Sequence, residues 1–400
     1  MRCAARGASR NPMKILALDP GWDHTPYLVA ELAKAGIEVV LATTLPEERY
    51  FLQRYCKQLP APWAAGSHDF YARLLRDQQA DLVLPLSEEI MEVIWQLPEN
   101  LTQRVFPQTT PLQRTLLGDR TQMYAFIEAQ GVPIPRMMAL GDRDEVPAAL
   151  EALGSPMVLR GTQGLAGLQV MIVRDVHEAQ RAYDDLVPRS PGPPFAQAFA
   201  MGRRCLIGGL FDRGQALQLF SQTTVESLRP PTGPSIRVRS LRDPKLERYA
   251  ERIFAALEWD GLACAEFIQD SQGDYRFLEI NPRPWAAIYA AHNCGVPLLR
   301  TFAAYLRGER APRRIEFPDG KEVVLFPQFI SARLAAGEFG RLRDVGSYLR
   351  SLRGAPWSRP MLVLHMLRRA MWSRRDPESA EETPPTDELA APCERVNEPS

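Results

Sequence analysis

Two apolar runs that each carry one acidic residue constrain the fold of this chain more than any other feature. Residues 262–268 (LACAEFI) contain Glu266, and residues 275–280 (YRFLEI) alternate bulky apolar side chains with others, so that Glu279 and Asn281 fall on one face. The segment DSQGD between the runs is rich in turn-forming residues, which predicts an antiparallel hairpin with Glu266 and Glu279 on one face. Carboxylate and amide oxygens grouped in this way suit a hard cation such as Mg²⁺. Solvated strand charges and a simple Asn-Pro turn are the alternative interpretation.

The composition points to a local site rather than to a global charge. Lys plus Arg and Asp plus Glu each number 48 among 400 residues, so no net field favours nucleic acid or a membrane surface. The six cysteines are scattered without CxxC or Cys/His spacing, which argues against zinc and disulfides and predicts a reduced, cytoplasmic setting. No apolar run approaches the ~20 residues of a transmembrane helix, and the polar leader before Met13 lacks the apolar core of a signal peptide.

Residues 13–112 are predicted to form a Rossmann-like domain. The order strand, helix, strand is predicted for residues 14–42, and another helix and strand follow within 69–86. The first turn, DPGWDH, lacks the GxGxxG pattern, so a dinucleotide site is not expected. The loops at 19–24 and 87–89 follow strands and are candidates to face a substrate, although ordinary capping and turn formation explain them equally well.

The acidic hairpin has a counterpart in a known family. GLACAEF…YRFLEINPRPW resembles the metal-binding hairpin of the ATP-grasp ligases, with carbamoyl-phosphate synthetase and biotin carboxylase as related types. The resemblance implies an α/β protein in which the Rossmann-like domain precedes a two-subdomain ATP-grasp fold at 113–310, with its lid at about 130–197. It also implies ATP and Mg²⁺ (or Mn²⁺) as cofactors, with the metal held by Glu266, Glu279 and Asn281.

Further motifs support this resemblance and suggest the nucleotide contacts. Gly118-Asp119-Arg120, a helix and GVPIPRM resemble the family's entry segment, which implies that Arg120 reaches an ATP phosphate. Residues 156–173 are predicted to be a glycine-rich hairpin, whose backbone N–H groups can approach phosphate oxygens; a plain flexible hairpin is the alternative. The similarity to the family's phosphate lid and adenine strand implies contacts from Arg160, Gly161, Gly164, Gly167, Ala196, Gln197 and Ala198.

Residues 221–243 are predicted to be a long substrate-facing loop. The segment is rich in Pro, Gly and Arg, and loops of that length are usually functional or disordered. Its place in the family implies that Ser235, Arg237 and Arg239 are candidates to meet an anionic acceptor. Arg204 departs from the family's pattern, which often has an acidic residue there for the ribose hydroxyls, and Ala198 stands where a Glu is common.

Arg283 follows the candidate metal ligand Asn281 by two residues. Its planar guanidinium can bridge phosphate and carboxylate oxygens at two points, and a plain surface arginine is the alternative. We expect Arg283 and Arg160 to be the catalytic residues, with Arg283 steadying an acylphosphate. Trp285 is expected to pack rather than to bind.

The resemblance ends before the C-terminal region. Residues 311–375 form an Arg-rich extension, and its segment 361–375 is predicted to be either a membrane-surface or partner helix or a helix packed on the protein. Residues 376–400 are acidic, rich in Pro and poor in aromatic residues, which predicts a disordered tail.

Together these features predict an ATP-dependent ligase that joins a carboxylate to an amine through an acylphosphate and releases ADP and phosphate. Its partners would be small-molecule substrates, with no role for nucleic acid. Two alternatives remain: a bicarbonate-activating carboxylase or carbamoyl-phosphate type of enzyme, and a nucleotide-binding scaffold without turnover. The chain lacks the Met-Lys-Met segment of a biotin carrier, which disfavours the first, and the paired acids disfavour the second.

Overall fold

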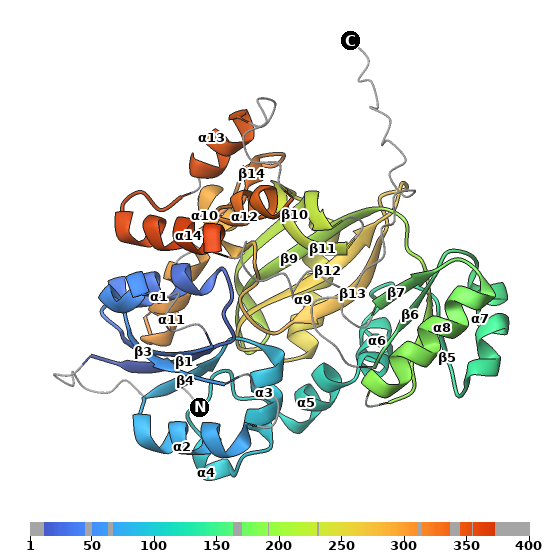
Figure 1. The fold of residues 1–400 in the computed structure, drawn as a ribbon, viewed down its shortest axis with the longest axis horizontal. Coiled ribbons are helices and arrows are strands. Elements are labelled where there is room, and N and C mark those ends of the chain that lie inside the picture. The colour runs from blue at the N-terminus through green and yellow to red at the C-terminus, as the bar shows by residue number, and fades with distance from the viewer. Residues whose placement is uncertain are drawn as a thin grey trace.

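The structure, a computed structural model, describes residues 12–44, 50–62, 67–162, 170–190, 192–229, 232–309, 314–336, 345–353 and 355–372. Within these residues a parallel sheet lies near the N-terminus, a six-stranded antiparallel sheet occupies the centre, and a smaller antiparallel sheet lies to the right in Figure 1. Helices pack on all three sheets, so the predicted mixed α/β architecture is confirmed. The division of the chain into domains stays a prediction.

The N-terminal sheet has the strand order β3-β2-β1-β4, and all its pairings are parallel. Its central strands are apolar because helices cover both faces: α1 packs on one face, and α2 and α3 pack on the other. This confirms the predicted strand-helix-strand order. The elements are β1 (Lys14–Asp19), α1 (Thr25–Lys34), β2 (Glu38–Thr43), η1 (Tyr50–Arg54), β3 (Lys57–Pro60), α2 (His68–Gln78), β4 (Leu82–Pro85), α3 (Glu88–Trp95) and α4 (Glu99–Thr102).

The small antiparallel sheet, here called the lid sheet, has the order β5-β8-β6-β7. Helices α7 and α8 cover one face and enclose a separate apolar core with it. The predicted glycine-rich hairpin is present as β6 and β7, but its residues 163–169, which include Gly164 and Gly167, lie outside the described residues. The elements are α5 (Pro111–Gly118), α6 (Arg120–Ala129), β5 (Met137–Ala139), α7 (Val146–Leu153), β6 (Met157–Arg160), β7 (Val170–Val173), α8 (Val176–Leu186) and β8 (Phe195–Ala198).

The central sheet has the order β13-β12-β9-β10-β11-β14, and neighbouring strands are antiparallel. The predicted pairing of the two acidic runs is confirmed, because they form β12 and β13. The elements are β9 (Arg203–Asp212), β10 (Gln215–Arg229), β11 (Thr232–Ser240), α9 (Pro244–Ala256), β12 (Gly261–Gln269), β13 (Tyr275–Asn281) and β14 (Glu322–Val324).

The prediction of a long loop at 221–243 is wrong. Most of this segment belongs to β10 and β11, which pair with three shifts of register. Its arginines do not require a solvated loop, since Arg237 forms ion pairs with Glu226 on β10 and Glu322 on β14. Val, Ile and Thr residues between the charges favour strands, and the irregular register of β11 accommodates Gly233 and Pro234.

The two faces of the central sheet have different coverings. One face packs against α6 and α9 through a core rich in phenylalanine. The opposite face carries Phe220 and Trp285 and shares a core with α1, α11 and the C-terminal helices. Trp285 is buried, as predicted, and Gly208 makes room for it, because a Cβ atom at Gly208 would lie 2.6 Å from the indole ring.

The C-terminal helices pack on the N-terminal and central parts of the molecule (Figure 1). In α14, Leu362 and Met366 are buried against α12 and η1, whereas Leu364 and Met371 face outward. Arg359, just before α14, pairs with Glu31 of α1 at 2.8 Å. The remaining elements are α10 (Ile288–Asn293), α11 (Leu298–Leu306), α12 (Gln328–Ala335), α13 (Val345–Arg353) and α14 (Pro360–Trp372).

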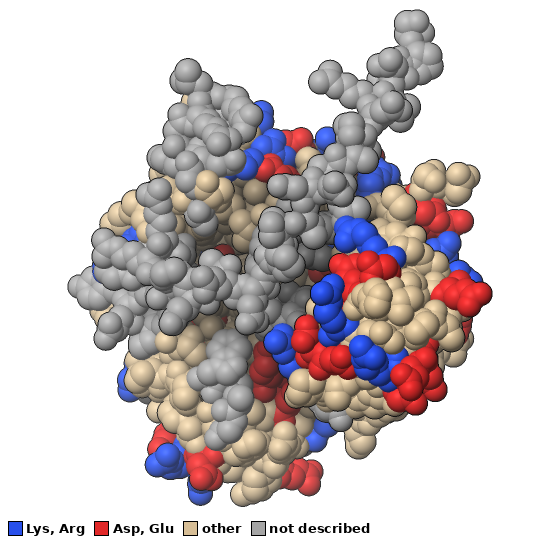
Figure 2. All heavy atoms as spheres, turned by 45° about the vertical axis from the view of Figure 1, so that its right-hand side comes forward, with Lys and Arg blue, Asp and Glu red and all other residues tan. Residues whose placement is uncertain are grey.

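These contacts support the packed-helix interpretation of residues 361–375. No helix among the described residues is long and apolar enough to cross a bilayer. Figure 2 shows basic and acidic side chains interspersed over the right-hand part of its face, in line with the balanced composition. The tail at 376–400 and the leader before Met13 lie outside the described residues, apart from Pro12.

Candidate active site

The acidic pair lies at the edge of the central sheet. Glu266 and Glu279 are directly opposite each other in the β12–β13 ladder, and Asn281 is opposite Cys264 two residues further along the same face. Burial, and after it the nearby Glu279 charge, raise the pKa of Glu266 to about 7 against the opposing effect of Arg204, Arg283 and Arg160. Two carboxylates and an amide therefore converge where extra positive charge would be stabilising.

Arg160 connects the lid sheet to this acidic pair. Its Nη2 atom lies 3.5 Å from the Glu279 carboxylate, and its Nη1 atom donates to the hydroxyl of Tyr124 at 2.7 Å. Tyr124 in turn donates to the carbonyl of Leu278 on β13 at 2.7 Å, so α6 fixes the arginine relative to the acidic strand. Arg160 is 5% exposed, and its Nε atom and the Nε2 atom of Gln197 are buried donors without an acceptor among the described residues.

Arg120 approaches the same place from the start of α6. Asp119 caps this helix by accepting from the backbone N–H groups of Thr121 and Gln122, which sets the direction in which Arg120 leaves the backbone. The guanidinium of Arg120 donates to the carbonyl of Gly161 at 3.0 Å, at the entrance to the glycine-rich segment. Burial and the neighbouring Arg160 charge lower the pKa of Arg120, so the two cations are close enough to repel each other.

Arg283 joins the site to the N-terminal sheet. Its Nε atom donates to Glu88 at 2.7 Å, its Nη2 atom donates to the Asn281 amide oxygen at 3.2 Å, and its guanidinium lies 5.0 Å above the ring of Trp22. Although burial opposes it, the Glu88 charge raises the pKa of Arg283. The two candidate loops at 19–24 and 87–89 therefore both reach Arg283.

The loop at 19–24 also contains the turn hydrogen bonds that were the alternative explanation for its sequence. Buried Asp19 accepts from the backbone N–H groups of Gly21 and Trp22 and from the hydroxyls of Thr25 and Thr43. These bonds fix the loop and hold Trp22 over Arg283.

The predicted adenine strand is β8. Its backbone at Ala196, Gln197 and Ala198 pairs with β6 on one side and with β5 or Arg136 on the other. Backbone groups available to a ligand therefore begin beyond Ala198. The adenine contact stays a prediction. Because the backbone of β8 is already paired, we expect the contact at the residues that follow this strand.

The three predicted substrate residues, Ser235, Arg237 and Arg239, do not form one cluster, because each already has partners on neighbouring elements. Arg237 donates to Glu226, Glu322 and Ser347, and Arg239 lies 3.7 Å from Glu322. Ser235 accepts instead from Arg204. The structure therefore brings Ser235 together with Arg204, and it places Arg237 and Arg239 in ion pairs with the edge strand β14.

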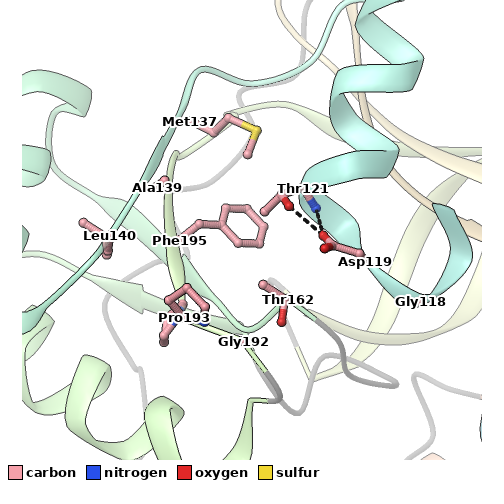
Figure 3. Close-up of a pocket in the computed structure, with 11 residues that line it drawn as sticks. Gly118, Asp119, Thr121, Met137, Ala139, Leu140, Thr162, Gly192, Pro193 and Phe195 are labelled. Atoms are coloured by element: carbon pink, nitrogen blue, oxygen red, sulfur yellow. Dashed lines mark hydrogen bonds between the residues drawn. The ribbon is translucent and has the colours of Figure 1, made fainter. Parts of the chain in front are cut away.

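A separate cavity of about 380 Å³ lies beside the start of α6 (Figure 3). Apolar residues such as Met137 and Phe195 line one side, and Asp119, Thr121 and Thr162 line the other. The Asp119 carboxylate already accepts from Thr121 in the helix cap. Among the described residues, none of the predicted site residues lines this cavity, although Asp119, Thr162 and Phe195 on its wall are chain neighbours of Arg120, Gly161 and Ala196.

A family model covers most of these residues. The model, described as an ATP-grasp domain, matches residues 117–287, which include Arg120, Arg160 and the whole β12–β13 hairpin. Residues 117–287 form an ATP-grasp domain. No curated protein sequence matches the chain.

Several solved structures share the fold. N5-carboxyaminoimidazole synthetase from Staphylococcus aureus is 17% identical with a TM-score of 0.65, and the match covers 82% of this chain and 87% of that one. Biotin carboxylase from Campylobacter jejuni is 14% identical with a TM-score of 0.64, covering 78% and 74%. The biotin carboxylase domain of the Hydrogenobacter thermophilus 2-oxoglutarate carboxylase, solved with MgADP and bicarbonate, is 16% identical with a TM-score of 0.64, covering 77% and 73%. At these identities the likeness establishes the fold.

The ATP-grasp domain holds few acids at its candidate metal site. No group of three or more His, Cys, Asp or Glu side chains suited to a metal occurs among the described residues, so any cation at Glu266 and Glu279 needs Asn281 and substrate oxygens to complete its shell. The sequence did not identify Tyr124 as the residue that positions Arg160, because an aromatic residue in an amphipathic helix is normally assigned to the core. It also did not identify Glu88 as the partner of Arg283.

Proposed function

We propose that this protein is an ATP-dependent ligase that joins a carboxylate to an amine through an acylphosphate and releases ADP and phosphate. The observation that carries the proposal is the register of β12 and β13, which sets Glu266 directly opposite Glu279, with Arg160 against Glu279 and Arg283 against Asn281. Paired acids flanked by arginines from other parts of the fold are suited to a metal-bound triphosphate and an anionic substrate.

The residues at the acidic pair fit Mg²⁺ or Mn²⁺. Their donors are all oxygens, and burial followed by the Glu279 charge raises the pKa of Glu266, so a cation beside the pair would favour its ionised form. Glu266, Glu279 and Asn281 would hold the metal. When bound, a divalent cation of this kind neutralises charge on the triphosphate.

Arg160 and Arg120 would hold the phosphates of ATP. Arg160 is the last residue of β6, and Arg120 donates to Gly161 just beyond it. The Nε atom of Arg160 and the Nε2 atom of Gln197 are buried donors with no acceptor in the described residues. Phosphate oxygens would satisfy these donors. A substrate carboxylate placed in line with the γ-phosphate would attack it, since such transfers depend mostly on positioning and on charge neutralisation.

Arg283 would hold the acylphosphate until an amine displaces phosphate. Its bonds to Glu88 and Asn281 fix the guanidinium before the substrate arrives, so little reorganisation is needed as charge develops. The amine attacks the acyl carbon, the bond from that carbon to the phosphate oxygen breaks, and phosphate leaves with the electron pair.

A second candidate is activation of bicarbonate in place of an organic acid. The similarity to carboxylases favours this candidate, and one of those structures contains MgADP and bicarbonate. Both candidates use the same arrangement of residues and both release ADP. They differ in the acid that stimulates ADP release.

The test measures ADP release and hydroxamate formation with ATP, Mg²⁺ and hydroxylamine over a panel of organic acids and bicarbonate. We expect an organic acid to give both products, and we expect Glu279→Gln to reduce the rate by at least about 10²-fold, because one charge is lost at the site. Glu316→Gln is the control, since that side chain is 80% exposed and far along the chain from the hairpin.

The remaining outcomes separate the alternatives. ADP release stimulated by bicarbonate alone supports the second candidate, and release of AMP with pyrophosphate contradicts both. Binding of MgADP without turnover by any acid supports a scaffold. Full activity in a folded Glu279→Gln protein would remove the acidic pair from the mechanism.

A further inference from the structure

Arg204 is a cation held only by neutral groups. It is the second residue of β9, and its guanidinium donates to the hydroxyls of Thr224 at 3.3 Å, Ser227 at 3.2 Å and Ser235 at 3.1 Å. Among the described residues no carboxylate lies within ion-pair distance of it. A half-buried guanidinium without a counter-charge is costly unless something neutralises it.

The other arginines on the same sheet are in a different situation. Arg237 pairs with Glu226 and Glu322, Arg239 pairs with Glu322, and Arg333 on α12 pairs with Glu226. The hairpin of β10 and β11 thus carries its own acids for its own arginines. On β9, Arg203 is exposed and donates to the neutral Gln269 at 2.6 Å, so Arg204 is the half-buried arginine of this region for which no carboxylate partner occurs among the described residues.

Arg204 also lies on the face of the sheet that carries the acidic pair. In the β9–β12 ladder Leu206 is opposite Glu266 and Arg204 is opposite Ile268, so Arg204 and Glu266 differ by one step along the same face.

Gln222 gives an independent indication of a ligand at this place. It lies opposite Leu206, in the same cross-strand row as Glu266, and it is 2% exposed. Its amide oxygen is buried and has no donor among the described residues. A buried acceptor without a partner is costly, which points to a donor group that a bound molecule would supply.

We infer that Arg204, Thr224, Ser227 and Ser235 form a subsite for an anionic group, a carboxylate or a phosphate, on the small-molecule substrate. The inference rests on the proposed function for the identity of that molecule as a substrate. Each hydroxyl that accepts from Arg204 keeps its own hydrogen, and one of these is used between Thr224 and Ser235 at 2.8 Å. The others are free to donate to the same anion as the guanidinium. The substrate would therefore carry an anionic group besides the reacting one.

The test is equilibrium binding by calorimetry with the full chain, which needs no turnover. Inorganic phosphate and succinate are titrated separately into protein saturated with MgADP, and MgADP is titrated by itself. We expect one of the two anions to bind, and Arg204→Gln to weaken its binding by at least about tenfold, as for the loss of one charge-assisted contact. Arg239→Gln, which removes an arginine already paired with Glu322, should change that affinity by less than about twofold.

The MgADP titration shows whether the anion that Arg204 binds belongs to the nucleotide or to the second substrate. The inference requires the MgADP affinity of Arg204→Gln to stay within about twofold of the wild type. If MgADP binding weakens instead, the arginine belongs to the nucleotide site and the inference is overturned. It is also overturned if neither anion binds the wild type, or if Arg204→Gln and Arg239→Gln weaken binding equally.

A second variant protects the test against misfolding. Ser235→Ala removes one hydroxyl from the subsite and leaves the charge, so it should weaken anion binding by a smaller factor than Arg204→Gln. Unchanged binding in both variants contradicts the subsite. Anion binding that depends on Arg204 in a protein without ligase activity would keep the subsite and reject the proposed reaction, so the two failures are distinguishable.

Discussion

At the scale of single residues, Arg283 owes its position to partners far away along the chain. Glu88 lies 195 residues before it, and Trp22 stands in the first loop of the N-terminal sheet. The guanidinium is therefore fixed by the assembled fold as well as by Asn281 at the end of β13. A cation held in this way is already oriented for the charge that develops during the reaction.

Replacing Arg283 should reduce the reaction far more than it reduces stability. We expect Arg283→Ala to lower kcat for ADP release by roughly 10²–10³-fold, as for the loss of one preorganised donor. Arg283→Lys should recover little, because an ammonium group cannot contact Glu88 and Asn281 with the same planar geometry. Steady-state kinetics of ADP release, with melting temperatures for folding, measure both effects.

Arg300→Ala is the matched control, since this arginine is 61% exposed and lies 3.9 Å from its partner Glu31. It should leave kcat unchanged. The kcat of Glu88→Gln should lie between those of Arg283→Ala and Arg300→Ala. The new amide still accepts a hydrogen bond from Arg283, but it carries no negative charge to pair with the guanidinium. A fully active Arg283→Ala protein would show that the developing charge is held elsewhere.

The candidate metal residues could be predicted from the sequence, whereas their supporting residues could not. Glu266, Glu279 and Asn281 follow from local patterns, namely alternation along a strand and a short turn. The bond from Arg160 to Tyr124 joins residues 36 apart, and neither local pattern nor spacing indicates it. Glu88 in α3 and the hydroxyls around Arg204 likewise come together only after the sheets assemble.

At the scale of elements, β10 and β11 show where composition misleads. Pro, Gly and Arg suggested a loop at 221–243, but a strand tolerates arginines when acids on neighbouring strands neutralise them. Those acids, Glu226 and Glu322, are 96 residues apart in number and only the sheet brings them to Arg237. The strands of the acidic hairpin were predicted to within a few residues because their signals are local.

The helix α14 gives a prediction at the same scale. Leu362 is fully buried and Leu364 is 47% exposed on the same helix, so the pair tests whether the helix is packed. We expect Leu362→Ala to lower the free energy of unfolding by roughly 2–5 kcal/mol, because it leaves a cavity in the core. Leu364→Ala should change it by less than about 0.5 kcal/mol. Chemical denaturation of both variants provides the measurement.

Vesicle binding distinguishes the other interpretation of this helix. A membrane-surface helix would use the outward residues Leu364 and Met371, so Leu364→Ala would weaken binding to anionic vesicles and Leu362→Ala would not. Equal stability of the two variants would contradict the packed arrangement.

At the scale of the whole molecule, the apolar cores are distributed unequally. One core contains residues from β1, α1, the central sheet, α11 and α14, so the N-terminal, central and C-terminal parts share their buried surface. The core of the lid sheet is built only from residues between Met138 and Ala198. Parts that share a core are expected to unfold together, and a part with its own core can open alone.

This distribution predicts two levels of protection in native-state hydrogen exchange. Amides of β6 in the lid sheet should exchange through an opening that leaves β1 protected, because most of the apolar surface that it exposes belongs to the lid core, and Phe195 on β8 and Met137 on β5 pack instead in the core of β9 and β12. MgADP should slow exchange in β6 more than in β1, since Arg160 at the end of β6 is proposed to hold phosphate and ligand binding stabilises the closed form. Glu279→Gln should reduce this effect of MgADP, because it removes a charge from the site at which the nucleotide is proposed to bind. Mass spectrometry of peptides from the two sheets gives the comparison.

Equal protection of the lid sheet and the N-terminal sheet, with no selective effect of MgADP, would contradict independent opening of the lid, because a single shared core requires all the strands to open together.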